Sequence, residues 1–305
     1  LMKSRMAASL ANQDQSPGAV FGERVRRLAT MDHYSVRPMR SEDLGRIDAD
    51  HMRAFYAERF KNAADFTFFF VGAFTVDEIT PLLTTYLASL PSTGKAESRG
   101  IDMGVHFPAA VQREIVSKGQ EPRSQTALMF FADTGLDELE THRLRAATRI
   151  LQTRLREVLR EELGGTYSVG VGYSDTSPQP GYGTTSVQFG SSPDNAERLT
   201  SVVMAEIDRL RREGPSDTDL QVVKETEKRG LEGSLLQNGY WLNSLEAMHL
   251  LERDPLSILQ RVERTESLSK ENIHAVVGKY FPFDRYAVVT LMPETNIPET
   301  RPIAT

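Results

Sequence analysis

A long amphipathic helix that stops at two glycines and continues as a strand is the feature that most constrains this fold. Apolar residues recur at three- and four-residue steps between about 140 and 163, which predicts one helix with a single apolar face: Leu144, Ala147, Leu151, Leu155 and Val158. Gly164 and Gly165 should end it, because a left-handed C-terminal cap costs glycine little. From 167 to 174, tyrosine or valine alternates with serine or glycine, which predicts a strand with one buried face.

The junction between these two elements carries Arg160 in the last turn of the helix and Tyr167 at the start of the strand. The ordinary interpretation is that Arg160 complements the helix dipole and that Tyr167 simply begins a strand. The functional interpretation is that a fixed cation and a phenol at one junction bind a peptide carbonyl. The residue pattern alone leaves both interpretations open.

Residues 105–305 are predicted to form a complete unit of the α+β class, because strands and helices are grouped without strict βαβ alternation. Strands are expected near 111–118, 125–133, 167–173, 183–189 and 286–292. Further helices are expected over 193–213, 218–251, 257–265 and 270–280. Ser216 and Asp219 have the spacing of a capping box that opens the second of these helices.

Residues 1–92 have a different pattern, which predicts helix, helix, strand and helix over 20–28, 41–60, 66–71 and 76–90. One strand is too little for a sheet of its own. We therefore expect residues 1–92 to be the C-terminal part of a preceding domain, with partner strands outside this chain. Residues 93–104 are polar and are expected to link it to the unit at 105–305.

Composition narrows the function classes. The 305 residues are 39% hydrophobic and 26% charged, which is ordinary for a soluble globular protein. A net charge of -6 with interspersed signs offers no basic face for nucleic acid, so no nucleic-acid partner is expected. The longest apolar run, Phe66 to Phe74, is too short for a membrane span. The absence of cysteine excludes disulfides and thiolate sites but leaves both the cytoplasm and the bacterial periplasm open.

The junction at 159–171 resembles the second signature of the pitrilysin/insulinase family of zinc peptidases, and most of all its PqqL-type bacterial members. In that signature an Arg and a Tyr, spaced seven apart around Leu-Gly, hold the substrate carbonyl or the tetrahedral intermediate. Here Arg160 and Tyr167 have that spacing around Leu163-Gly164. Other segments between about 20 and 295 are also similar: Phe66 to Phe74, Leu90-Pro91, Phe189 to Asp194, Gly214 to Ser216, and Asn238 to Leu242. The resemblance implies an antiparallel or mixed sheet covered by helices.

One family feature is missing from this sequence. Members that cut peptides carry His-x-x-Glu-His on a helix, with two imidazoles that bind zinc and a glutamate as general base. The six histidines of this chain are never closer than 18 residues to one another. The resemblance therefore implies a C-terminal half without zinc or any other cofactor, inactive by itself.

The expected partners are a peptide substrate and a zinc-bearing half, supplied by the same polypeptide or a neighbouring subunit. The first ten residues agree with this expectation, because they read as mid-chain helix rather than as a signal peptide. In this reading Arg160 and Tyr167 complete a composite active site whose zinc motif lies outside the chain. The alternative is a non-catalytic peptide-binding or assembly module that keeps the fold.

Three other groups of residues could form sites, but they are expected to be structural. Glu246 and His249 form one Glu-x-x-His pair, whereas a di-iron bundle needs two such pairs. Asp48, Asp50 and His51 fit an ordinary solvated helix face. The third group is the aromatic pair Tyr240 and Trp241, for which burial in a core is the favoured interpretation and a peptide groove the other.

Overall fold

The structure is a computed structural model that describes residues 2–97, 102–163, 168–176 and 180–294. The chain divides into two compact units. Unit 1 comprises Leu1–Met39, Met103–Lys228 and Arg261–Thr305, and unit 2 comprises Arg40–Asp102 and Arg229–Gln260. No helix of the described residues is long and apolar enough to cross a membrane.

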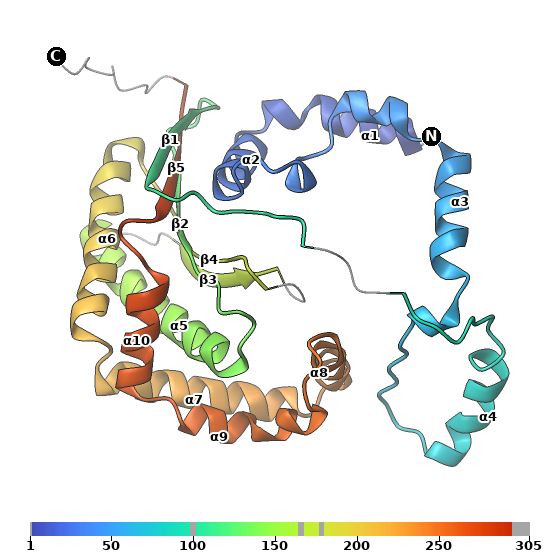
Figure 1. The fold of residues 1–305 in the computed structure, drawn as a ribbon. Coiled ribbons are helices and arrows are strands. Elements are labelled where there is room, and N and C mark those ends of the chain that lie inside the picture. The colour runs from blue at the N-terminus through green and yellow to red at the C-terminus, as the bar shows by residue number, and fades with distance from the viewer. Residues whose placement is uncertain (1, 98–101, 164–167, 177–179, 295–305) are drawn as a thin grey trace. The chain divides into compact units, whose positions relative to one another are not determined.

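Unit 1 is built on a five-stranded mixed sheet (Figure 1). Its strands are β1 (Gln112–Ser117), β2 (Ser124–Phe131), β3 (Val169–Asp175), β4 (Gly183–Ser191) and β5 (Tyr286–Met292). They lie in the order β1-β5-β2-β4-β3, with β1 and β5 parallel and the other pairs antiparallel. The predicted α+β class and the expected mixed sheet are confirmed, and β3 lies at one edge.

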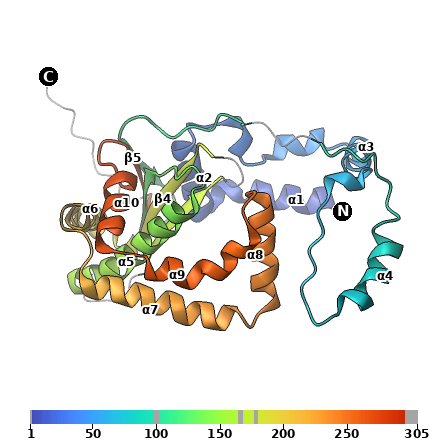
Figure 2. The ribbon, with the colours of Figure 1, turned by 60° about the horizontal axis from the view of Figure 1, so that its bottom comes forward.

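One face of this sheet is covered by α5 (Glu138–Leu163), α6 (Ala196–Glu213) and α10 (Lys270–Tyr280) (Figure 2). The apolar stripe predicted for the first of these helices faces the core, because Leu144, Leu151 and Leu155 are fully buried. They pack with the side chains that β2 and β4 direct to the same face, such as Phe130 and Val187. Unit 1 also contains α9 (Arg261–Glu266) and most of α7 (Asp217–Ser234).

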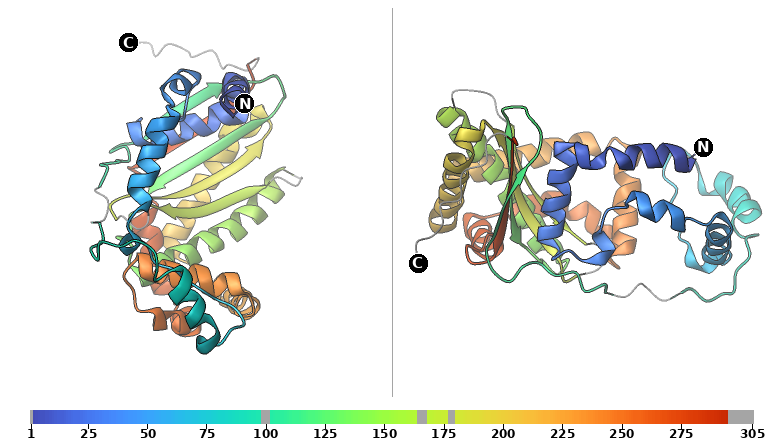
Figure 3. Two further views of the ribbon diagram at one scale, coloured as in Figure 1. Left: turned by 90° about the vertical axis from the view of Figure 1, so that its right-hand side faces the viewer. Right: turned by 90° about the horizontal axis from the view of Figure 1, so that it is seen from above.

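The opposite face of the sheet is covered by α2 (Pro17–Ala29), which follows α1 (Met2–Ala11) (Figure 3). Phe21 of this helix is buried against Met129 and Val289. The Tyr182 hydroxyl donates to the carbonyl of Ala29 at 2.9 Å, and burial raises its pKa to about 12. Residues 1–39 therefore pack with the sheet of 105–305, so the compact units do not divide at residue 92. The assignment of 1–92 to a preceding domain stays a prediction.

Unit 2 contains the helices α3 (Ala49–Phe60), α4 (Val76–Tyr86) and α8 (Asn238–Leu250). Short 3-10 helices in the two units cover Gln13–Gln15, Tyr34–Val36, Ser41–Arg46, Ala63–Asp65, Pro193–Asn195 and Pro255–Gln260. The prediction of one helix over 41–60 is wrong. Asp48 interrupts it, because its carboxylate accepts the backbone N–H groups of Asp50 and His51 and so caps a new helix.

Two further predictions are corrected. The helix expected over 218–251 is two helices, α7 and α8, which are separated by residues 235–237. The strand expected over 66–71 is not a strand, because no other strand among the described residues pairs with this segment. Strand geometry needs a neighbouring backbone to accept and donate hydrogen bonds, so alternation in the sequence was not sufficient here.

Candidate functional site: the end of the long helix

Arg160 lies in the last turn of α5, as predicted, and its side chain is exposed. Its neighbour Leu159 is buried in the core, which turns Arg160 away from the sheet. Among the residues that the structure describes, its guanidinium has no ion-pair or hydrogen-bond partner. The end of α5 thus presents a cation that no described side chain neutralises.

Tyr167, the second predicted site residue, lies outside the described residues, as do Gly164 and Gly165. The strand that follows is β3, which begins at Val169 and packs against α5. It pairs with β4 on one side only, because it is the edge strand. The predicted helix and the strand after it are confirmed, whereas the glycine cap and the juxtaposition of Arg160 and Tyr167 stay predictions.

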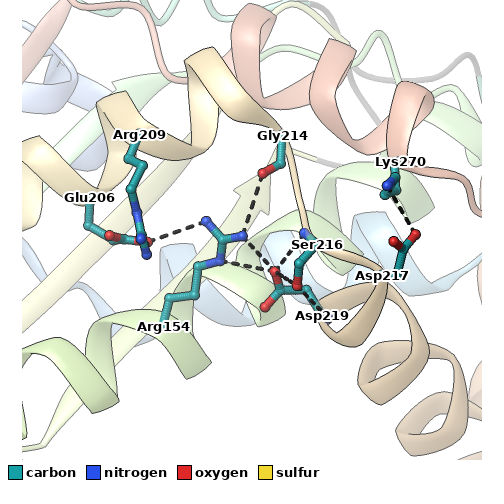
Figure 4. Close-up of polar contacts among 8 residues, drawn as sticks. All are labelled: Arg154, Glu206, Arg209, Gly214, Ser216, Asp217, Asp219 and Lys270. Atoms are coloured by element: carbon teal, nitrogen blue, oxygen red, sulfur yellow. Dashed lines mark hydrogen bonds and ion pairs between the residues drawn. The ribbon is translucent and has the colours of Figure 1, made fainter.

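The C-terminal half of α5 is anchored to its neighbours by Arg154 (Figure 4). Its guanidinium donates to Asp219 Oδ2 at 2.6 Å and lies 3.4 Å from Glu206 Oε1. Glu206 is buried on α6 and also accepts from Arg209 at 2.9 Å. The same guanidinium reaches the carbonyl of Gly214, where α6 ends. One arginine therefore ties α5 to α6 and to the start of α7.

Asp219 has two roles in this network. The predicted capping box is present, because the Ser216 N–H donates to Asp219 Oδ2 at 2.8 Å and the Asp219 N–H donates to Ser216 Oγ at 3.1 Å. Burial pushes the pKa of Asp219 up, but the hydrogen bonds from Arg154 and Ser216 together hold it below its usual value. Asp219 therefore both caps α7 and anchors α5.

A second anchor lies nearer the start of α5. Glu227 of α7 accepts from His142 Nε2 at 2.8 Å and from Arg149 at 2.6 Å. Thr265 of α9 donates to the same carboxylate at 3.0 Å. Burial pushes the pKa of Glu227 up, and its hydrogen bond to His142 with the charge of Arg149 outweighs this and lowers it. The two anchors hold α5 in position along its length.

These lowered pKa values predict a loss of stability in acid. A carboxylate whose pKa is lower in the folded state stabilises the fold above its unfolded pKa of about 4 to 4.5, and this contribution is lost as the pH falls through the folded pKa. The difference in unfolding free energy between the wild-type chain and Glu227→Gln should therefore be largest near pH 6 and shrink toward pH 3. Urea unfolding at each pH measures it.

The exposed Glu161, on the same helix α5, provides the matched control. Glu161→Gln should give a small difference with little dependence on pH, since exposed ion pairs contribute little. A difference for Glu227→Gln that stays constant from pH 6 to 3 would contradict the assignment of the anchor.

The other predicted groups have structural contacts. His249 Nε2 lies 2.9 Å from Thr67 Oγ1, and Asp50 pairs with Arg53 at 2.8 Å. Tyr240 and Trp241 are half-buried on α8 rather than buried in a core, so that part of the prediction is wrong. In the described part of the chain, no group of three or more His, Cys, Asp or Glu residues could hold a metal ion. The described residues therefore do not fit a zinc site.

A comparison with protein families shows to which family this chain belongs. The family model described as the peptidase M16 inactive domain matches residues 46–227, which is more than half of the chain. The chain belongs to the peptidase M16 family. The resemblance to pitrilysin-type zinc peptidases is thereby confirmed, and the match is to the inactive domain of that family.

Relatives of this M16 chain include zinc proteases. A protein from Arabidopsis thaliana named zinc protease PQQL-like is 26% identical over 320 residues, which cover 94% of this chain and 33% of the relative. The fold is similar to the periplasmic protease PqqL from Escherichia coli, with a TM-score of 0.78, 20% identity and coverage of 96% of this chain and 32% of that one. An M16 inactive domain from Pseudomonas fluorescens has a TM-score of 0.76 with 17% identity, over 98% of this chain and 71% of that one. The chain spans about a third of the length of its PqqL-like relatives.

Proposed function

We propose that this M16 inactive domain is the substrate-binding half of a PqqL-like zinc endopeptidase, in which Arg160 and Tyr167 bind the carbonyl of the scissile peptide bond. The observation that carries the proposal is the exposed guanidinium of Arg160, which lies at the end of an anchored helix without a partner among the described residues. Arg154 of the same helix, in contrast, is paired with Asp219. Arg160 is instead available to a ligand.

The chemistry follows from the donors that this half contributes. A guanidinium and a phenol can both donate hydrogen bonds to the oxygen on which charge develops when a peptide bond is attacked. Fixed donors stabilise such charge because they need little reorganisation during the reaction. The anchors at Asp219 and Glu227 supply that rigidity by holding α5. In this proposal the zinc and the general base belong to the other half.

In this proposal, the substrate class and the compartment are inferred from the relatives. The Escherichia coli structure is described as a periplasmic protease, and a related structure is that of the ferredoxin protease FusC with Arabidopsis ferredoxin bound. A peptide or small protein is accordingly the proposed substrate, and the periplasm the proposed compartment.

Activity measurements on two proteins test the proposal. The present chain should not hydrolyse internally quenched peptides, because its half supplies neither metal nor general base. The longer natural polypeptide should hydrolyse them if it carries His-x-x-Glu-His, and exchange of that glutamate for glutamine should abolish the activity. Hydrolysis by the present chain alone, or peptide binding without hydrolysis by a longer polypeptide that lacks the motif, would favour a binding or assembly module.

A further inference from the structure

Two arginines one turn apart lie at the C-terminal end of α5. Arg156 and Arg160 are both exposed, and neither forms a hydrogen bond or an ion pair with any residue that the structure describes. Residues four apart lie on the same face of a helix, about 6 Å apart along its axis. The end of α5 thus carries two adjacent cations without a described carboxylate at ion-pair distance.

The nearby carboxylates of α5 lie on another side of the helix. Glu157 and Glu161 are exposed, and each follows one of the two arginines by one position. One position corresponds to about 100° around a helix with 3.6 residues per turn. The charges at this end of α5 are therefore separated into a basic side and an acidic side.

The two arginines that precede this pair in the sequence are already bound. Arg154 donates to Asp219 at 2.6 Å, and Arg149 donates to Glu227 at 2.6 Å. Both ion pairs connect α5 to α7, so they hold the helix from which Arg156 and Arg160 extend. A ligand of this pair therefore binds to a helix that is already positioned, which lowers the entropy cost of binding.

We propose that Arg156 is a specificity-determining residue, which binds an acidic side chain of the peptide substrate two residues from the scissile bond. This inference rests on the proposed function, in which Arg160 binds the scissile carbonyl. Side chains on one side of an extended peptide recur about every 6.6 Å, which is close to the axial separation of the two arginines. A peptide that lies along α5 with its scissile carbonyl at Arg160 therefore places the side chain two residues away at Arg156.

The chemistry of the guanidinium selects a carboxylate as its ligand. An arginine keeps its charge at physiological pH, and its planar fork can donate two parallel hydrogen bonds to a carboxylate. The net charge of this chain, -6, does not by itself attract acidic peptides, so a preference for them requires local cations. The substrate class is a peptide with Asp or Glu at the position beside Arg156.

Fluorescence anisotropy with the 305-residue chain tests the site directly. The probes are three labelled hexapeptides that differ only at one position, which is Glu, Gln or Lys. The Glu probe should bind about fivefold more tightly than the Gln probe, which corresponds to one well-formed exposed ion pair. The Lys probe should bind most weakly, and the preference should shrink at high salt because salt screens exposed charges.

Charge reversal separates a specific contact from a structural role. Arg156→Glu should reverse the order of the Glu and Lys probes, whereas loss of the fold would weaken the binding of all three. Arg145→Glu is the matched control, because Arg145 is exposed on the same face of α5 but lies about 16 Å from Arg156 along the axis. That distance exceeds the Debye length of about 8 Å at physiological salt, so this variant should keep the wild-type order. Thermal unfolding checks that both variants are folded.

Hydrolysis by a longer polypeptide that carries the zinc motif locates the subsite. In an otherwise neutral quenched peptide, Glu is placed in turn at each position on both sides of the scissile bond. The ratio kcat/KM should rise for one position only, two residues from that bond. Arg156→Glu should remove this rise.

Failure of this proposal differs from failure of the proposed function. Hydrolysis of all the peptides without a preference for Glu would leave the proposed function intact and overturn the role of Arg156. Binding of the Glu probe through Arg156, without hydrolysis of any peptide, would support the subsite and contradict the endopeptidase function. Equal binding of the three probes, an equal gain from Glu at every position, or equal effects of Arg145→Glu and Arg156→Glu would each overturn the proposal.

Discussion

On the proposed function, replacing Tyr167 by Phe in a longer polypeptide that carries the zinc motif is expected to lower turnover by roughly two to three decades, since one donor aimed at developing charge contributes about 3 to 4 kcal/mol. The Michaelis constant should change much less, because the lost hydrogen bond strengthens mainly in the transition state. Arg160→Lys should also be impaired if the contact is bidentate, since lysine keeps the charge but loses the planar fork. Steady-state kinetics on a quenched peptide measure both constants.

Thermal unfolding of each variant separates a catalytic effect from misfolding. Arg145→Lys is the control, because Arg145 is an exposed arginine of the same helix far from its C-terminal end. It should have wild-type turnover. Near-normal turnover of well-folded Tyr167→Phe and Arg160→Lys enzymes would assign both residues to the scaffold.

Arg154→Met is expected to lower the free energy of unfolding of the chain by about 3 kcal/mol, which is the lower end of the range for breaking a buried pair. The substitution leaves the buried carboxylate of Glu206 with Arg209 alone, and Asp219 with Ser216 alone. Arg209 and Ser216 keep the loss near that lower end. Urea unfolding of the wild-type and variant chains provides the measurement.

Arg156→Met provides the comparison, because Arg156 is exposed and lies only two residues further along α5. Its cost should be within about 0.5 kcal/mol, as for most surface substitutions. Equal losses for the two variants would mean that the network around Arg154 does not hold α5 in place.

The sequence patterns of unit 1 predicted its elements well because each element is amphipathic on its own. The stripe from Leu144 to Leu155 faces the core, and the alternation after Val169 is a strand. The capping box at Ser216 could be recognised because its two residues lie three positions apart. The second role of Asp219, which is to bind Arg154 of α5, could not be predicted from the local sequence, because the two residues are 65 positions apart.

Two features that the sequence did not predict depend on distant partners. Residues 66–71 alternate like a strand, but strand geometry also requires a paired neighbour, which the described residues do not supply. The covering of the sheet by α2 was not predicted, because an apolar helix face does not specify which sheet it meets. For the candidate site, the place of Arg160 on the helix could be predicted, whereas its lack of a partner among the described residues required coordinates.

The position of β5 in the sheet has a consequence for synthesis of the protein. This strand follows all the other described elements in sequence, yet it lies between β1 and β2 and pairs with both. While Tyr286–Met292 is still inside the ribosome, β1 has no neighbour and the apolar side chains of α2 have no complete surface to cover. Ribosome-bound chains should therefore remain open to proteases and chaperones until β5 has left the ribosome. Loss of a few residues from β5 would then affect both faces of the sheet together.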